Sequence, residues 1–239
     1  MDLALILCAH GAGGASAASE RHADSIRRRV IFRDVRACCL KGRPSLAETL
    51  STIDAAHIYI APFLMSRGHT WNTVLPSMLR ECRDTPPRVT IGQPVGLDLM
   101  VAEIIATRAL EVCDARAWSP RETRALLVAH GTERDADARE AAVEHVKRIR
   151  STGVFADVSA AFLSDTPSLD AALAGAAHDP CVVIGLFAEH GAHGADDVRN
   201  AIRRAAQRIA YAGPIGDDPG FAEIIIRHVL SAEGLRTAA

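Results

Sequence analysis

Short apolar runs alternate with longer amphipathic stretches along this 239-residue chain. The runs at 3–9, 57–64 and 88–92 are partly β-branched and are bounded by glycine, proline or polar residues, as buried parallel strands are. Between such runs, stretches such as 16–29 and 97–113 place apolar residues at helical spacing. This alternation predicts an α/β fold, in which helices cover both faces of a parallel sheet and right-handed crossovers join the strands.

The chain contains two tandem copies of one unit. Residues 94–110 match residues 214–230 at eight of 17 positions, and residues 34–50 match residues 157–173 equally well. Equivalent residues lie about 120 to 124 positions apart along the whole chain. Self-similarity of this extent indicates a duplicated domain.

Residues 118–122 separate the two copies, with Pro120 at the centre of this segment. We therefore predict two domains, residues 1–118 and residues 122–239. Each is expected to be a flavodoxin-like unit with a four-stranded parallel sheet, the strand order 2-1-3-4 and helices on both faces. The fourth strand of the second copy, near 208–213, has the weaker pattern. In such folds the working groups lie on loops at the carboxyl ends of the strands.

The composition narrows the class of function. Hydrophobic residues make up 49% of the chain and charged residues 23%, which excludes a disordered chain. A net charge of -2 without a basic block gives no case for nucleic acid or an anionic membrane as partner. No apolar run approaches the roughly 18 residues of a membrane span, and the acidic second residue argues against a signal peptide.

The six cysteines form no CxxC pair. Most of them lie in or beside apolar runs, where a free cysteine behaves as a small hydrophobic residue. We expect buried, reduced thiols in a cytoplasmic protein. The cysteines are Cys8, Cys38, Cys39, Cys82, Cys113 and Cys181.

Each copy places two histidines where functional groups are expected. A histidine followed by glycine comes directly after the first strand, as His10 and His130. A second histidine follows six residues after the phenylalanine that is predicted to close the third strand, as His69 and His193. In the order 2-1-3-4 the first and third strands are neighbours, so the two imidazoles of one copy can converge on one cleft.

The remaining histidines have weaker support. His190 corresponds to Ser66 in the first copy, so it is either a second ligand or a surface residue. Five others have no histidine at the equivalent position and are predicted to be surface or structural residues. They are His22, His57, His145, His178 and His228.

Other chemistries lack their motifs in this sequence. There is no GxSxG nucleophile elbow, no Walker motif and no GxGxxG that opens a helix. Both copies have AHG after the first strand, whereas a phosphohistidine mechanism calls for RHG. Cysteines and histidines do not cluster at the spacing of a structural zinc site.

Four motifs in order resemble one known family. They are HGTERD after the first strand, FLSDTPSL after the second, an FxxxGxH turn after the third and PIGDDPGFAEII before the last helix. This set resembles the CbiX-type sirohydrochlorin chelatases of the class II chelatase family, whose large members are tandem repeats of a flavodoxin-like unit. The resemblance implies insertion of Co²⁺ or Fe²⁺, or Ni²⁺ in some relatives, into sirohydrochlorin. This reaction feeds cobalamin or siroheme synthesis, without ATP and without a cofactor beyond the metal substrate.

The resemblance also implies roles for the four histidines. By position, the metal-binding and catalytic histidines of the family fall on His10 and His69 in the first copy, and on His130 and His193 in the second. Neutral imidazole suits Co²⁺, Fe²⁺ and Ni²⁺, and near neutral pH it can also accept pyrrole protons. Two arginines could bind the carboxylates of the tetrapyrrole or remain solvated. These are Arg67 and Arg134.

The sequence departs from the family after the second strand. The family often has glutamate there, whereas this chain has Lys41 and Ser164, with Asp165 one residue further on. An alternative to the enzyme is therefore a non-catalytic carrier of metal or tetrapyrrole, and a third is an unrelated small-molecule enzyme on the same fold. The expected partners are a tetrapyrrole and a divalent metal, with no nucleic acid and no membrane, and the expected state is a monomer or homodimer.

Overall fold

The computed structural model describes residues 2–11, 16–82, 88–131, 137–174, 179–189, 192–205 and 208–234. The chain forms two compact units. The first comprises Met1–Asp98 and Pro219–Ala239, and the second comprises Leu99–Asp218. Within the described ranges, no helix has the length and apolar character needed to cross a membrane.

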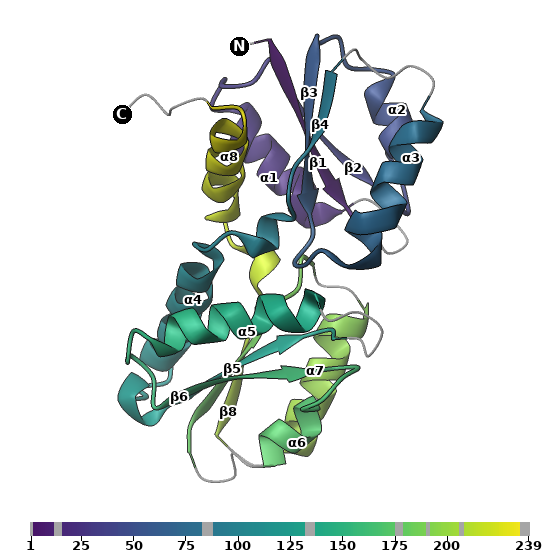
Figure 1. Ribbon diagram of the computed structural model, residues 1–239. Helices are drawn as coiled ribbons and strands as arrows, with labels where there is room; N and C mark the ends of the chain where they lie inside the picture. Colours follow the sequence, from purple (N-terminus) through teal and green to yellow (C-terminus); the bar gives the residue numbers. More distant parts are fainter. Residues whose placement is uncertain are drawn as a thin grey trace. The chain divides into compact units, whose positions relative to one another are not determined.

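The first unit is built on a four-stranded parallel sheet in the order β2-β1-β3-β4 (Figure 1). This is the order that the sequence predicted. The central strand β1 is buried along its whole length, because strands flank it on both sides and helices cover both faces of the sheet. The strands are β1 Leu3–Ala9, β2 Asp34–Cys39, β3 His57–Phe63 and β4 Arg88–Ile91.

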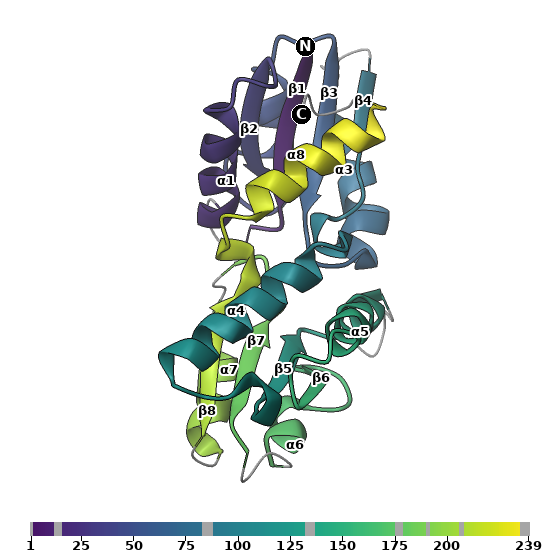
Figure 2. The same cartoon turned by 90° about the vertical axis from the view of Figure 1, so that its left-hand side faces the viewer.

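Helices cover both faces of the first sheet. Helices α1 and α8 lie on one face, and α2 and α3 lie on the other (Figures 1 and 2). A π-helical turn precedes α3, and a 3-10 turn follows β4. The bounds are α1 Ala17–Arg27, α2 Leu46–Leu50, the π-helix Thr70–Val74, α3 Leu75–Glu81, the 3-10 turn Val95–Leu97 and α8 Phe221–Ala232.

The second unit repeats this plan. Its parallel sheet has the order β6-β5-β7-β8, with α4 and α5 on one face and α6 and α7 on the other (Figure 2). The strands are β5 Arg124–Ala129, β6 Asp157–Phe162, β7 Cys181–Gly185 and β8 Ile209–Pro214. The helices are α4 Val101–Ala115, α5 Asp137–Arg150, α6 Leu169–Ala174 and α7 Ala192–Arg204, with 3-10 turns at Pro120–Glu122 and Ile215–Asp217.

The compact units do not coincide with the two repeats 1–118 and 122–239. Helix α4 comes from the first repeat but belongs to the second unit, and α8 comes from the second repeat but belongs to the first. Both helices bury an apolar face, so each requires a sheet to pack on. Each repeat therefore supplies the last helix of the unit built mainly by the other.

Helices α1 and α5 each bury a histidine at the same position. His22 lies five residues before Arg27, the last residue of α1, and His145 lies five residues before Arg150, the last residue of α5. They are only 3% and 2% exposed, and the His22 ring contacts Phe63 at 5.2 Å between centroids. The prediction that these histidines lack histidine counterparts is wrong, because the copies are offset here by 123 residues rather than the 120 found at the first strand.

Candidate functional site

The sheet order brings the ends of the first and third strands together. In the first unit Ala9 pairs with Phe63, so His10 and the turn after β3 lie at the same sheet edge. In the second unit β5 pairs with β7, and His130 follows the last residue of β5. Strand β7 ends at Gly185, so Phe187 lies two residues beyond the strand and does not close it as predicted. A Cβ atom at Gly185 would overlap the Phe187 ring, at 2.6 Å.

A glycine in the left-handed conformation follows each first-strand histidine. Gly11 has φ 68° and Gly131 has φ 67°. A Cβ atom at Gly11 would lie 2.7 Å from the Cβ of Cys39, and one at Gly131 would lie 2.7 Å from the Cβ of Phe162. Both the conformation and the close approach require glycine. The HG pair is therefore explained by the packing of this turn against the end of the second strand.

The loop after the second strand holds each histidine by its main chain. The N–H of Lys41 donates to the carbonyl of His10 at 2.8 Å, and the N–H of Ser164 donates to the carbonyl of His130 at 2.8 Å. Lys41 and Ser164 therefore lie directly beside the two histidines. Their side chains differ in charge, which makes the two sites electrostatically different.

The His130 ring is fixed by a hydrogen bond to its own turn. Its Nδ1–H donates to the carbonyl of Gly131 at 3.0 Å, because a carbonyl oxygen can only accept. In the neutral ring this leaves the lone pair on Nε2. A histidine held in this tautomer can bind a metal through Nε2 or accept a proton there.

His10 is the counterpart of His130 in the first unit, and both residues are exposed. Partial desolvation and, second, the positive charge of Lys41 lower the pKa of His10. The ring is therefore predominantly neutral at pH 7. The lysine charge also repels a divalent cation that approaches this imidazole.

The turn after β3 in the first unit carries His69 at the start of the π-helix. Single π-helical turns are frequent at functional sites. Arg67 lies over the Trp71 ring at 5.9 Å, and its Nε–H donates to Gln93 at 3.0 Å. The N–H of Gly96 donates to the carbonyl of Leu64, so the loop after β4 braces the turn that carries His69.

The corresponding turn in the second unit is described in part. The backbone of His193 lies in the first turn of α7, whereas its side chain lies outside what the structure describes. His190, Arg134 and His178 lie outside the described residues. Gly216 donates its N–H to the carbonyl of Phe187 at 3.0 Å. A brace from the loop after the fourth strand is thus shared by both units.

A pocket of about 430 Å³ opens beside His130. The end of β6 and the loop after it form one side, and α6 and α7 form the rest. From the sequence, Asp197 is expected to be a first-turn acid of the helix that follows the third strand, but it lies beyond the first turn of α7 and lines this pocket instead. The sequence contained a signal for this pocket face, because the α7 residues that line the pocket recur at helical intervals. They are Asp197, Asn200, Ala201 and Arg204.

Asp165 lies next to the His130 turn. Its carboxylate accepts a hydrogen bond from the Thr166 N–H at 2.6 Å and pairs with Arg139 at 2.6 Å. The Thr166 N–H is the main cause that lowers the pKa of Asp165, and Arg139 adds to it. A Cβ atom on Gly131 would lie 2.8 Å from the Cβ of Asp165. The second unit therefore has an ionised carboxylate where the first has Gly42.

No three His, Cys, Asp or Glu side chains form a metal-binding group among the residues that the structure describes. The fold and the strand-end histidines define a tandem chelatase-like α/β protein, with a flavodoxin-like sheet in each unit. Comparison with known families gives a match to the CbiX model over residues 4–112 and again over 124–232. The chain belongs to the CbiX family.

Among proteins of known description, the chain is 26% identical over 267 residues to a probable sirohydrochlorin cobaltochelatase of Halobacterium salinarum, covering 96% of this chain and 91% of that protein. It is also similar to two solved structures, each at 22% identity and over 95% of this chain. The first, with a TM-score of 0.80, is a multi-domain Deinococcus radiodurans protein with structural similarity to chelatases, and the chain spans 54% of its length. The second is CbiX, the terminal enzyme for biosynthesis of siroheme in denitrifying bacteria, matched over 98% of its length with a TM-score of 0.77.

Proposed function

We propose that this protein inserts a divalent metal, Co²⁺ or Fe²⁺, into sirohydrochlorin or a related tetrapyrrole, without ATP. The hydrogen bond from His130 Nδ1–H to the Gly131 carbonyl carries this proposal, because it leaves Nε2 available to bind the metal and accept a pyrrole proton. Family membership and the name of the Halobacterium relative support the substrate class. The metal ion is a substrate here, and a site with few protein ligands leaves positions for the tetrapyrrole nitrogens.

The second unit is the proposed catalytic unit. There the His130 carbonyl is held by Ser164, and the ionised Asp165 follows. In the first unit the equivalent of Ser164 is Lys41, whose charge opposes cation binding at His10. We assign His193, at the start of α7, as the second histidine of the working pair, with His10 and His69 as its less active counterparts.

The test is to incubate the protein with sirohydrochlorin and Co²⁺, and separately with Fe²⁺, and to follow the absorbance change of the macrocycle. Loss of the proton acceptor and ligand in His130→Ala is expected to lower the rate about 100-fold or more. His10→Ala is the matched control and is expected to keep most of the rate. If both single variants and the double variant kept the full rate, the histidine mechanism would be refuted.

A carrier is the second candidate. Lys41 favours it for the first unit, because its charge beside His10 weakens metal delivery there. Metal insertion no faster than the uncatalysed rate, together with tight tetrapyrrole binding, would support the carrier over the enzyme. Cytoplasmic location and a monomeric or dimeric state accompany either proposal.

A further inference from the structure

A polar groove of about 560 Å³ follows the open edge of the first sheet. Strand β2 forms this edge, and residues from α1, from β2 with the turn after it, and from the end of α2 line the groove. None of the described site histidines lines it. The groove is therefore separate from the candidate site.

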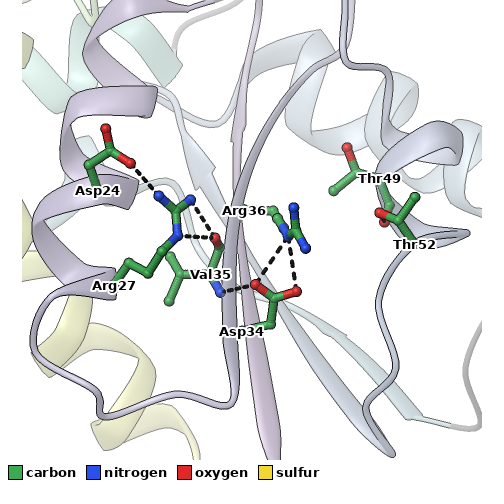
Figure 3. Close-up of polar contacts among 7 residues, drawn as sticks. All are labelled: Asp24, Arg27, Asp34, Val35, Arg36, Thr49 and Thr52. Atoms are coloured by element: carbon green, nitrogen blue, oxygen red, sulfur yellow. Dashed lines mark hydrogen bonds and ion pairs between the residues drawn. The ribbon is translucent and has the colours of Figure 1, made fainter.

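Arg36 lines this groove, and only part of its guanidinium group is hydrogen-bonded. Its Nε–H is shared by the two carboxylate oxygens of Asp34, at 3.1 and 2.9 Å. Within the described residues, its two terminal nitrogens make no hydrogen bond or ion pair. Figure 3 shows Arg36 between Asp34 and the threonines of the α2 end, Thr49 and Thr52. A pair of terminal N–H groups matches two oxygens of a carboxylate or phosphate.

The opposite side of the groove offers acceptors. The hydroxyl of Thr49 donates to the Ser45 carbonyl at 2.8 Å, and the hydroxyl of Thr52 donates to the Thr49 carbonyl at 2.9 Å. Because both hydroxyl protons are already donated within the protein, the two oxygens can only accept a hydrogen bond from a ligand. On the α1 side, the Glu20 carboxylate also lines the groove. Both sides therefore offer acceptors to a ligand with hydroxyl donors.

The edge of β2 is closed to an added peptide strand. Arg27 donates two N–H groups to the Val35 carbonyl, at 3.2 and 2.8 Å (Figure 3). Further along, the Cys39 N–H donates to the Pro44 carbonyl at 2.8 Å. These contacts occupy the outward main-chain groups at both ends, so an extended segment cannot pair along the strand. A compact ligand fits the remaining space.

The second unit shows which of these features the fold requires. Arg150 caps the Val158 carbonyl just as Arg27 caps that of Val35. The polar lining is repeated only in part, since Arg36 corresponds to Ser159 and three further polar positions become apolar, whereas Arg27 and Arg43 correspond to Arg150 and Thr166. Glu20 corresponds to Val143 and Thr49 to Ala172. The lining is thus a property of the first unit that this fold does not need.

We propose that the groove binds a small hydroxylated anion. A phosphate or carboxylate head lies on the terminal nitrogens of Arg36, and hydroxyl groups donate to Thr52 and Glu20. This site is independent of metal insertion, so its failure leaves the proposed function standing, and the reverse also holds.

Calorimetric titration of the full chain tests the proposal with four probes. Glycerol 3-phosphate and glycerate carry both the head and the hydroxyls, inorganic phosphate carries the head alone, and glycerol carries the hydroxyls alone. Arg36→Ser places the second unit's residue at this position and is expected to weaken binding about tenfold or more. Arg28→Ser, which removes an exposed charge outside the groove, is the matched control and is expected to change affinity less than twofold.

Saturable binding of either hydroxylated anion, lost in Arg36→Ser and kept in Arg28→Ser, supports the site. Preference between glycerol 3-phosphate and glycerate then identifies the head as phosphate or carboxylate. Three results overturn the proposal: no saturable binding at millimolar probe, equal weakening by both variants, or inorganic phosphate binding as tightly as the hydroxylated anions. Circular dichroism of each variant confirms that the fold is intact.

Discussion

Replacement of Val30 by glycine should stabilise the first unit. Val30 has φ 56° in the turn after α1, a conformation in which a β-branched side chain is strained. Its side chain is 84% exposed, so removal forfeits little buried area. In the second unit the equivalent residue is Gly153, with φ 64°. The two repeats thus contain the same turn with and without the strained residue.

The expected change in the free energy of unfolding is the difference between two opposing effects. A left-handed conformation costs an ordinary residue about 1–2 kcal/mol. Glycine gives back about 0.4–1 kcal/mol because it makes the unfolded chain more flexible. Val30→Gly should therefore stabilise the fold by about 0.5–1 kcal/mol. The reverse change, Gly153→Val, should destabilise it by a similar amount, because no atom lies within 4 Å of a Cβ at Gly153 and the backbone strain alone acts.

Urea unfolding followed by far-UV circular dichroism measures both changes. Because two units can unfold in separate transitions, the midpoint of each transition is compared. Val154→Gly is the control, since Val154 lacks a positive φ and glycine there should only destabilise. Backbone strain at Val30 would be refuted by a Val30→Gly variant that lowers the midpoint as Val154→Gly does, or by a Gly153→Val variant that leaves the midpoint unchanged.

Three further predictions concern the site. Gly131→Ala should destabilise the second unit by about 1–3 kcal/mol and slow metal insertion, because its Cβ would lie 2.7 Å from that of Phe162; unchanged unfolding and rate would contradict this. Gly216→Ala should both destabilise the second unit and slow metal insertion, because a Cβ there would lie 2.1 Å from the Ala188 carbonyl oxygen in the loop after β7; an unchanged insertion rate would refute the bracing role. The main-chain N–H that follows Asp165 lowers the pKa of that carboxyl, so its stabilisation is present above about pH 4 and is lost as pH falls through the folded-state value. Asp165→Asn should then unfold more easily than wild type at pH 7 but not at pH 2, whereas a constant difference would count against the ion.

The sequence predicted the strands and their order because buried parallel strands are short, apolar and bounded by turn residues. β1 and β3 begin where predicted, and both sheets have the order 2-1-3-4. The sequence did not predict that α4 belongs to the second unit and α8 to the first. Sequence similarity identifies the repeat to which a helix belongs, whereas an amphipathic face shows only that some sheet must cover it.

For the site, the spacing located the histidines but not the roles of their neighbours. That Gly131 supplies both a tight turn and the acceptor for the His130 ring depends on a side-chain rotamer, which no spacing encodes. The α7 face that lines the pocket was visible as a helical repeat from Asp197 to Arg204. It was missed because the sequence suggested that Asp197 lies in the first turn and is favoured there by the helix dipole, whereas α7 begins at Ala192 and has no acid in its first turn.

The two repeats serve as controls for each other. Where both copies keep a residue, as with the glycine after each histidine, the turn geometry explains it without catalysis. Where the two copies differ beside the equivalent histidine, the fold tolerates either residue. The difference can therefore reflect function. Lys41 opposes a cation at His10, whereas beside the turn of His130 the second unit has Ser164 and an Asp165 carboxylate that is paired with Arg139. Replacement of the positive Lys41 side chain by the neutral one of the second unit, in Lys41→Ser, should therefore raise the affinity of His10 for a divalent metal if charge alone separates the two units.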